Sequence, residues 1–381
     1  MQVHFIDTNE KLIAICQHFA QSDFLALDTE FVRQTTYYPI LALLQLCDGQ
    51  QIAIIDPLAI KDLSPLMTVL YNKDITKVLH SARQDMEIFY YLNQSVPESL
   101  FDTQVCAALL GFGEQIGYAP LVKQLLNVDL DKSQTRTDWL KRPLSQRQID
   151  YAADDVRYLA KIYPLQQKNL QDLGRSNWLE KDFQFLSDTT TYTPSPDTIW
   201  RKVKGVNKLK KQKLAILKKL AAFREELALQ QNRPRRRVIA DDVLIDLSIN
   251  PAANLSELQE HQGLSYKFLE YNGAAILSLI QQGLDTADKN CPTLPVYKKL
   301  SQNEQALADC LMAIVHLSAN NNRISPQCLC SRKELDALIK GQRELSVLSG
   351  WRNELIGKHL LKFLTGEAQL SYTSGQLVFK E

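Results

Sequence analysis

The chain has 381 residues, of which 45% are hydrophobic and 23% charged, and this composition excludes a disordered or low-complexity protein. Its length allows two or three domains, and no apolar run approaches the ~20 residues that a membrane span needs. The first residues lack the pattern of a signal peptide, and the seven cysteines include no C-x-x-C pair, so we expect a reduced, cytoplasmic protein without membrane contact.

Charge is distributed unevenly along the chain, although the formal net charge is only +1. Residues 1–190 carry 17 Lys and Arg against 24 Asp and Glu, whereas residues 191–381 carry 27 against 19. Residues 198–240 alone hold 14 basic side chains and two acidic ones. An acidic first half followed by a basic segment predicts one part that binds cations and another that binds a polyanion.

Strand-like and helix-like patterns alternate in the first half. Short apolar runs bounded by turn residues predict five strands, at 24–31, 40–47, 51–56, 75–80 and 99–102. The first three follow one another closely, as in a three-strand meander, and a helical pattern follows each of the last two. The sequence therefore predicts a mixed α/β sheet with helices on its faces.

The first predicted strand contains two acids one residue apart, Asp28 and Glu30 in "LALDTE". Alternation along a strand puts both on one face, where like charges repel each other unless a cation lies between them. An exposed strand face, an acid–base pair of carboxylates and a metal site all fit this pattern when it is taken alone.

The helix predicted from Ser81 places a third acid beside the core. Ser81 and Gln84 match a capping box. The apolar stripe of this helix leaves Asp85 on its border, whereas Glu87 points to solvent. We therefore take Asp85 as the functional candidate of this helix.

Two neighbouring polar residues have simpler interpretations. Asp102 precedes a predicted helix, where Asp is a common N-cap. His80 has no second His at ligand spacing, and we interpret it as a boundary histidine with satisfied hydrogen bonds rather than as a general base.

A second informative helix is predicted over 144–164, and Pro164 is expected to end it. The centre of its apolar stripe lies about 170° from Asp154 but only about 70° from Asp155. Asp155 therefore borders the core together with Tyr151, one turn earlier, and Asp154 faces solvent.

These positions can converge at one edge of the sheet: Asp28, Glu30, Asp85, Tyr151 and Asp155. Carboxylates without Lys or Arg partners require cations, and oxygen ligands without clustered His or Cys favour Mg²⁺ or Mn²⁺. Two such ions ~3.5–4 Å apart can activate a water and stabilise the leaving oxygen of a phosphodiester. The shared face of the two strand acids is thus explained as a metal site.

The second half is predicted to be helical. "TYTPSPDT" at 191–198 has the composition of a linker. Stretches within 238–280 and 323–364 are alike at an offset of about 84 residues, which indicates a duplicated small helical domain. The run "RPRRR" at 233–237 fits either a solvated turn or a phosphate-binding patch. We favour the patch because the Lys-rich segment 201–219 accompanies it.

Three stretches resemble the motifs of the DEDD 3′→5′ exonucleases: "LDTEF" at 27–31, the Asp of "HSARQD" at 80–85 and "YAADD" at 151–155. The tyrosine of the third stretch is typical of the DEDDy branch. The segments 28–46 and 138–159 are similar to ribonuclease D in particular, and the duplicated tail resembles the HRDC domains of that family.

The resemblance implies a ribonuclease-H-like exonuclease domain at 1–190, a linker at 191–209 and HRDC-like all-α domains at 210–290 and 294–370. It implies that two divalent ions are bound by Asp28, Glu30, Asp85 and Asp155. Tyr151 would then orient, and help to deprotonate, the water that attacks the terminal phosphodiester.

The implied activity is removal of 5′-mononucleotides from the 3′ end of RNA, with tRNA precursors and other small structured RNAs as partners. Thr29, Phe31 and Gln45 flank the acids as candidates to contact the terminal nucleotide, and Phe31 fits a core position equally well. The basic run supplies further substrate-binding candidates, which are Arg235, Arg236 and Arg237. We expect a monomer.

Two alternatives stand beside this function. A DNA 3′→5′ repair or proofreading exonuclease would use the same chemistry, although no G-x-x-x-x-G-K-[ST] motif is present. A catalytically inactive nucleic-acid-binding module is the other alternative, against which the five intact catalytic positions argue.

Overall fold

The strands of the first half form one six-stranded sheet in the computed structural model, which describes residues 1–131, 133–134, 137–295 and 299–380. The sheet order is β1-β4-β3-β2-β5-β6, with β1 (Gln2–Ile6), β2 (Phe24–Val32), β3 (Ile40–Cys47), β4 (Gln51–Ile55), β5 (Thr76–Leu79) and β6 (Leu100–Asp102). The pairs β2–β5 and β5–β6 are parallel, and β3–β4 is antiparallel, so the predicted mixed sheet is confirmed. The strand β1 was not predicted from the sequence, and it pairs parallel with β4 at the edge.

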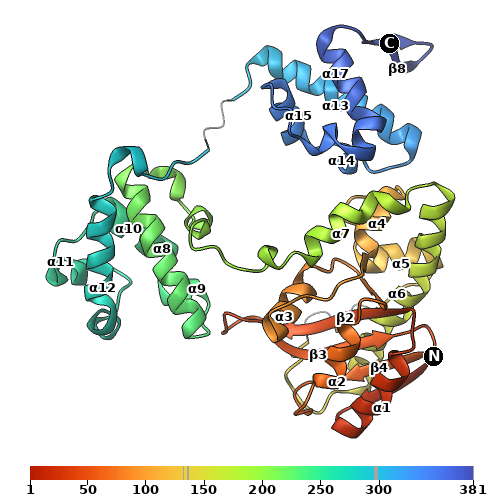
Figure 1. Cartoon of the computed structure of the whole chain (residues 1–381), viewed down its shortest axis with the longest axis horizontal. Helices are drawn as coiled ribbons and strands as arrows, with labels where there is room; N and C mark the ends of the chain where they lie inside the picture. Colours follow the sequence, from red (N-terminus) through yellow and green to blue (C-terminus); the bar gives the residue numbers. More distant parts are fainter. Residues whose placement is uncertain (132, 135–136, 296–298, 381) are drawn as a thin grey trace. The chain divides into compact units, whose positions relative to one another are not determined.

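The described elements group into two units. Unit 1 comprises Met1–Glu30, Leu41–Thr189 and Lys298–Glu381, and unit 2 comprises Phe31–Ile40 and Thr190–Tyr297. The helices of the first half, drawn with the sheet in Figure 1, are α1 (Asn9–Phe19), α2 (Ser64–Leu70), α3 (Arg83–Asn93), α4 (Thr103–Leu109), α5 (Tyr118–Leu126), α6 (Gln146–Asp172) and α7 (Glu180–Ser187). Within the described residues, no helix is long and apolar enough to cross a membrane.

The start of α3 differs from the prediction. The helix begins at Arg83, and no side chain caps its first turn. Ser81 has a φ of +65°, so the chain turns there before the helix begins. The N–H groups of Ser81 and Ala82 donate to the Asp102 carboxylate at 3.1 and 2.8 Å. The predicted capping box is therefore wrong, because a carboxylate distant in sequence anchors this turn instead.

Helix α6 continues beyond the residue that was predicted to end it. It runs from Gln146 to Asp172 with Pro164 inside. Proline removes the N–H that would bond to the carbonyl of Ala160, but the buried face continues on the far side as far as Leu170. Burial of this second half offsets one lost hydrogen bond, so the predicted end at Pro164 is wrong.

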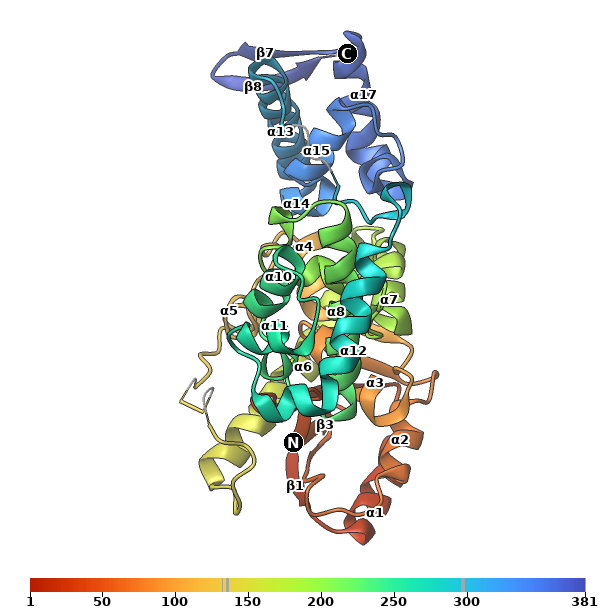
Figure 2. The ribbon, with the colours of Figure 1, turned by 90° about the vertical axis from the view of Figure 1, so that its left-hand side faces the viewer.

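The C-terminal part of unit 1 is a helical bundle that ends in a hairpin (Figure 2). Its helices are α13 (Gln302–Asn322), α14 (Pro326–Leu329), α15 (Arg332–Ile339), α16 (Gly350–Arg352), a π-helical turn (Asn353–Gly357) and α17 (Lys358–Thr365). The strands β7 (Gln369–Thr373) and β8 (Gln376–Lys380) pair antiparallel after α17. This hairpin lies almost wholly beyond the range 294–370 predicted for the second helical domain.

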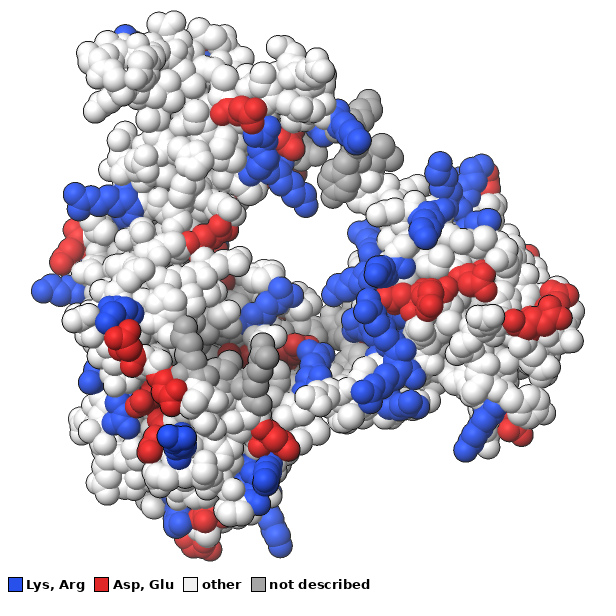
Figure 3. Space-filling model, turned by 180° about the vertical axis from the view of Figure 1, so that it is seen from behind, with Lys and Arg blue, Asp and Glu red and all other residues white. Residues whose placement is uncertain are grey.

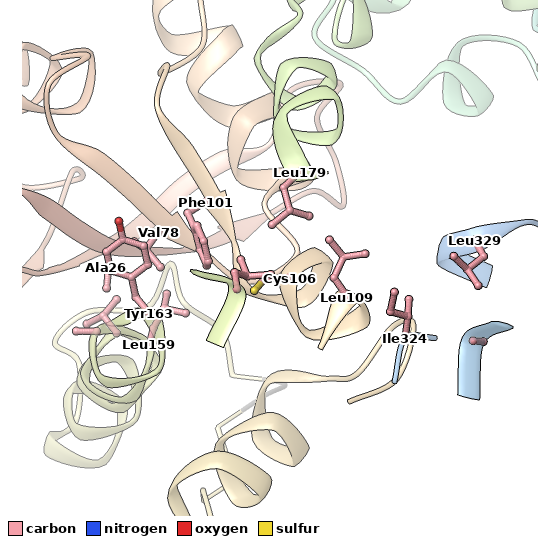
Figure 4. Packing of buried hydrophobic residues seen from close by; sticks show 14 of the residues in the cluster. Ala26, Val78, Phe101, Cys106, Leu109, Leu159, Tyr163, Leu179, Ile324 and Leu329 are labelled. Carbon is pink, nitrogen blue, oxygen red and sulfur yellow. The ribbon is translucent and has the colours of Figure 1, made fainter. Parts of the chain in front are cut away.

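The C-terminal bundle shares a core with the first half of the chain, which contains the six-stranded sheet. Figure 4 shows the buried side chains continuing from Cys106 and Leu109 towards Ile324 and Leu329. Hydrogen bonds join the same surfaces, since the N–H of Ser325 donates to the carbonyl of Ala108 at 3.0 Å.

Two further contacts hold this junction. Arg175 donates to the carbonyls of Leu109 and Asn322 at 2.7 and 2.6 Å. The rings of Trp178 and Trp351 are stacked with their centroids 4.4 Å apart. Unit 1 is therefore joined by direct backbone, guanidinium and aromatic contacts as well as by its core.

Unit 2 is helical, with α8 and α12 side by side at its centre (Figures 1 and 2). Its helices are α8 (Gln212–Gln230), α9 (Arg235–Val238), α10 (Asp241–Ile249), α11 (Leu255–Glu260) and α12 (Tyr266–Leu284). A Cβ on Gly283 would lie 2.7 Å from the backbone of Ile216, so glycine permits the close approach of the two long helices.

The range 191–209, predicted as a linker, contributes to this helical core. Short 3₁₀ turns run through its second part, and Ile199, Trp200 and Val203 are buried there. The loop that connects β2 to β3 also belongs to unit 2, where Tyr37 donates a hydrogen bond to the buried Glu225.

Candidate active site

Three acids converge between β2 and α6. Asp28 and Glu30 of β2 and Asp155 of α6 each offer a carboxylate oxygen, and these oxygens lie within 4.8 Å of one another. They line a cavity of 400 Å³ with Tyr151, His80 and the start of α5. Of the residues that the structure describes, no Lys or Arg lines this cavity. Within the described part of the chain, the cavity lining thus concentrates acidic side chains without a Lys or Arg to balance their charge.

The local structure explains this convergence. Alternation along β2 buries Leu27 and turns Asp28 and Glu30 to the other face, as the sequence predicts. On α6, Tyr151 and Asp155 lie one turn apart and line the same cavity. Asp154 instead pairs with Arg157 at 2.8 Å and leaves 40% of its side chain exposed. The helical face predicted for these residues is the one observed.

Asp85 of α3 lies beside this group but outside it. Its side chain is buried and accepts a hydrogen bond of 2.5 Å from the Thr29 hydroxyl. Thr29, predicted to contact a terminal nucleotide, therefore uses its hydroxyl to hold a neighbouring carboxylate. Phe31 follows on β2 with a partly buried side chain.

Burial raises the pKa values of all four carboxyls, and repulsion from neighbouring acids raises them further. Burial raises the pKa of Glu30 to about 9, with further contributions from Asp28 and Asp85. Burial raises the pKa of Asp85 to about 7, although the Thr29 hydrogen bond opposes this. The pKa values of Asp28 and Asp155 lie well above their usual range, because both carboxyls are buried among other acids. A bound cation would stabilise the ionised carboxylates and so lower these pKa values.

The turn that leads into α3 is held by Asp102 and His80. Asp102 caps α4 by accepting from the N–H of Gln104 at 2.8 Å, as predicted, and it also anchors the turn at Ser81. The ring nitrogens of His80 lie 2.9 Å from the Thr103 hydroxyl and 3.0 Å from the carbonyl of Ile116. The prediction of a satisfied boundary histidine is confirmed, although its ring also lines the acidic cavity.

The sequence pattern gave no role to the segment before α6. Arg142 donates to both carboxylate oxygens of Asp56, at 2.6 and 2.8 Å, and to the carbonyl of Ala42 at 2.7 Å. Trp139 is buried, and its ring centroid lies 6.1 Å from that of Tyr151. These contacts fix the chain to the sheet where α6 begins, and the only sequence signal for them is the run "DWLKRP" itself.

Other residues of the neighbourhood were also missed or remain unexplained. The Tyr118 hydroxyl donates to the carbonyl of Asp154 at 3.0 Å and so joins α5 to α6. Asp131 lines the cavity and accepts from the N–H of Ser133. Gln45 is fully buried on β3, and neither atom of its side-chain amide has a hydrogen-bond partner among the described residues. It does not line the cavity, although the sequence placed it beside the acids.

The three arginines predicted to bind substrate differ in their surroundings within unit 2. Arg235 is partly buried and donates to Glu225 at 2.6 Å, and Arg236 pairs with Asp241 at 2.9 Å. Arg237 is exposed. Two of these three arginines therefore form ion pairs with carboxylates of unit 2.

Two known families match the chain. Residues 3–171 match the family described as 3′-5′ exonuclease, and residues 213–280 match the HRDC domain family. The chain is 36% identical to ribonuclease D of Zymomonas mobilis over 383 residues, which covers 99% of this chain and 98% of the other. It is 35% identical to ribonuclease D of Bartonella henselae over 365 residues, covering 94% and 89%.

A solved structure extends the similarity to three dimensions. The crystal structure of Escherichia coli RNase D, described as an exoribonuclease involved in structured RNA processing, matches with a TM-score of 0.82 and 31% identity. The match covers 97% of this chain and the whole of that one. The predicted fold class, an exonuclease domain followed by a helical HRDC region, is confirmed by these comparisons.

Proposed function

This chain belongs to the ribonuclease D family of 3′→5′ exoribonucleases, and we propose that it trims the 3′ ends of structured RNA precursors, notably tRNA, to release 5′-mononucleotides. We further propose that it acts as a monomer in the cytoplasm with two Mg²⁺ or Mn²⁺ ions. The observation that carries the proposal is the convergence of three carboxylates in a cavity that no described Lys or Arg lines.

The residues present fit divalent ions. The acids supply only oxygen ligands, which suit Mg²⁺ and Mn²⁺ rather than a softer metal. Their raised pKa values indicate that the carboxylates are poorly stabilised without a cation. Asp28, Glu30 and Asp155 would share one ion, and Asp85, held by Thr29 beside them, would help to bind the second.

Divalent ions bound there would favour deprotonation of a water and stabilise the charge that develops on the phosphodiester oxygens. Tyr151 lines the cavity on the same helical face as Asp155, so its hydroxyl can orient the attacking water. Trp139 and the Arg142 anchor hold the start of α6, which sets the position of the Tyr151 ring. Thr29 keeps the Asp85 carboxylate in one orientation.

An assay with a tRNA precursor tests this function. A 3′-extended tRNA and a single-stranded DNA of the extension's sequence are incubated with Mg²⁺, Mn²⁺ or EDTA, and the products are separated by chromatography. We expect nucleoside 5′-monophosphates from the RNA with either metal and none with EDTA. Faster hydrolysis of the DNA would favour the repair exonuclease, and no hydrolysis of either substrate would favour the inactive binding module.

A further inference from the structure

One buried amide in the sheet has no local explanation. Figure 3 shows charged side chains spread over one face of the molecule, where water can solvate them. Gln45 of β3 is fully buried instead, and neither its amide nitrogen nor its amide oxygen has a hydrogen-bond partner among the described residues. A buried amide without partners costs free energy, which an apolar side chain of similar shape would avoid. The stability of the core therefore does not explain why this position carries an amide.

The sheet register places Gln45 on the face that carries the acids. Gln45 pairs with Ile54 across β3 and β4, and paired residues point to the same face. Ile54 and Ala26 belong to one buried cluster with residues of α6, and Figure 4 shows residues of this helix beside Ala26. Alternation along β2 puts Asp28 on the same face as Ala26. Gln45 and Asp28 therefore both point to the side of the sheet that α6 covers.

The connection between the two strands brings these side chains within reach of each other. β2 and β3 are neighbours in the sheet, and the loop 33–39 that joins them is too short for a parallel crossover. Antiparallel pairing of the strand ends puts Gln45 level with Leu27. Its nearest neighbours on the same face of β2 are then Ala26 and Asp28. Both lie closer than a diagonal pair, across which long side chains still meet.

The Asp28 carboxylate has room for a further donor. It accepts from the backbone of Thr29, and no side chain in the described part of the chain donates to it. Asp85, in contrast, accepts from the Thr29 hydroxyl. Carboxylates that bind metal ions are usually held by such donors from neighbouring residues. A buried donor without an acceptor thus lies beside a carboxylate without a side-chain donor.

We propose that Gln45 is a positioning residue of the metal site, whose amide N–H donates a hydrogen bond to the Asp28 carboxylate when a divalent ion is bound. This inference rests on the proposed function, in that the acids hold divalent ions. An ionised carboxylate accepts such a bond more strongly than a neutral carboxyl does. Gln45 then holds Asp28 as Thr29 holds Asp85. Gln45 thereby acts on a metal ligand, rather than on the terminal nucleotide as the sequence suggested.

Gln45→Met tests this role, because methionine is an unbranched side chain of similar size without a donor. The matched control is Gln166→Met. Gln166 is also fully buried, on α6, but its amide nitrogen donates to the carbonyl of Thr103 at 3.1 Å. For the full-length proteins, calorimetry gives the Tm in EDTA and electron paramagnetic resonance gives the Mn²⁺ affinity without RNA. Steady-state hydrolysis of a 3′-extended tRNA gives kcat and KM.

We expect stability and metal binding to change in opposite directions in Gln45→Met. The Tm in EDTA should rise by about 2–4 °C, because an unpartnered amide leaves the core. The Mn²⁺ affinity should fall about 10–100-fold. At a fixed Mn²⁺ concentration below saturation, kcat should fall while KM for the RNA stays within about twofold. Gln166→Met should instead lower the Tm, because it leaves the Thr103 carbonyl unpaired, and should not change the Mn²⁺ affinity.

Two results would overturn the proposal. One is an unchanged Mn²⁺ affinity in Gln45→Met. The other is a lower Tm in EDTA, which would show that the amide already stabilises the ion-free protein. Gln45→Leu should change both quantities in the same directions, which separates a lost donor from a packing defect of one side chain. A wild type that binds no Mn²⁺ would refute the proposed function together with this role, whereas failure in the Gln45 variants alone would leave the proposed function intact.

Discussion

At the scale of single residues, the acids of the cavity make the sharpest prediction. Asp28→Asn, Glu30→Gln, Asp85→Asn and Asp155→Asn should each reduce kcat by several orders of magnitude, because each removes a proposed metal ligand. Asp154→Asn should stay within a factor of about two, since its carboxylate pairs with Arg157 outside the cavity. Steady-state hydrolysis of a 3′-extended tRNA measures both. Equal damage from Asp154→Asn and Asp155→Asn would show that the helical face is assigned incorrectly.

The raised pKa values predict how metal binding depends on pH. Because the folded state holds the protons of these carboxyls more tightly than the unfolded chain does, its metal-free stability falls as pH rises from about 4 towards the Glu30 pKa of about 9. Metal ions replace those protons. The rise in Tm on adding Mg²⁺ should therefore be larger at pH 8 than at pH 6, as measured by calorimetry.

The control for this pH dependence is the Asp28→Asn, Glu30→Gln, Asp155→Asn triple variant. It lacks all three carboxyls of the three-acid group, so its Tm should respond weakly to Mg²⁺ and equally at both pH values. A wild-type response of the same size at pH 6 and pH 8 would mean that the carboxyls are already ionised in the metal-free protein.

Residue types and spacing were sufficient to predict that Asp28, Glu30 and Asp155 converge, but not that Asp85 lies beside this group or how the acids are held. Alternation along β2 and the face of α6 are local properties, so Asp28, Glu30 and Asp155 could be placed from the sequence. The bond from Thr29 to Asp85 joins residues 56 positions apart, and no local pattern encodes it. The Asp102 carboxylate was predicted as a local cap, but its bonds to the turn at Ser81 again depend on the tertiary fold.

At the scale of elements, the position of α6 determines how Tyr151 acts. Tyr151→Phe should lower kcat by about 10²–10⁴, the usual range for acid–base assistance, with little change in metal affinity. Lysine cannot form the bidentate contact that Arg142 makes with the Asp56 carboxylate. Arg142→Lys should therefore lower kcat about tenfold, because the start of α6 is held less firmly. Single-turnover kinetics with saturating enzyme measures both.

The Arg142→Lys, Tyr151→Phe double variant tests whether Arg142 affects kcat through Tyr151. If Arg142 acts through Tyr151, then Arg142→Lys should have less than about a twofold effect in the Tyr151→Phe background. Additive losses would indicate that the Arg142 anchor supports the site in another way. Unfolding in urea checks that the variants remain folded.

The elements themselves were predicted well where their pattern is strong. The five predicted strands agree with the structure to within one residue at each end. The edge strand β1 was missed because it is a run of only five residues at the start of the chain, and only one of them is buried. The continuation of α6 past Pro164 was missed because its cause, burial of the second half of the helix against other elements of unit 1, is a tertiary effect.

At the scale of the whole molecule, unit 1 should unfold as one body even though its sequence is discontinuous. Ile324 is buried where the C-terminal bundle meets the first half, and Ile324→Ala should lower the free energy of unfolding by about 2–5 kcal/mol. Far-UV circular dichroism and nuclease activity should then be lost together in urea. Ile13→Ala, at an exposed position of α1, should change stability by less than about 0.5 kcal/mol.

Loss of the C-terminal bundle at a urea concentration that leaves activity unchanged would show that this part folds independently. The sequence could not predict this grouping. The repeat between 238–280 and 323–364 suggests two equivalent helical domains, whereas the contacts that place the second with unit 1, such as the Trp178–Trp351 stack, join residues far apart in the chain.

The central claim is that the acids between β2, α3 and α6 bind two catalytic divalent ions. Crystals of the chain grown with Mn²⁺ and measured at the manganese absorption edge test it most directly. We predict two anomalous peaks ~3.5–4 Å apart among the carboxylates of Asp28, Glu30, Asp85 and Asp155, both of them lost in Asp28→Asn. Peaks elsewhere in the molecule, or none at a Mn²⁺ concentration that supports full hydrolysis, would contradict the account.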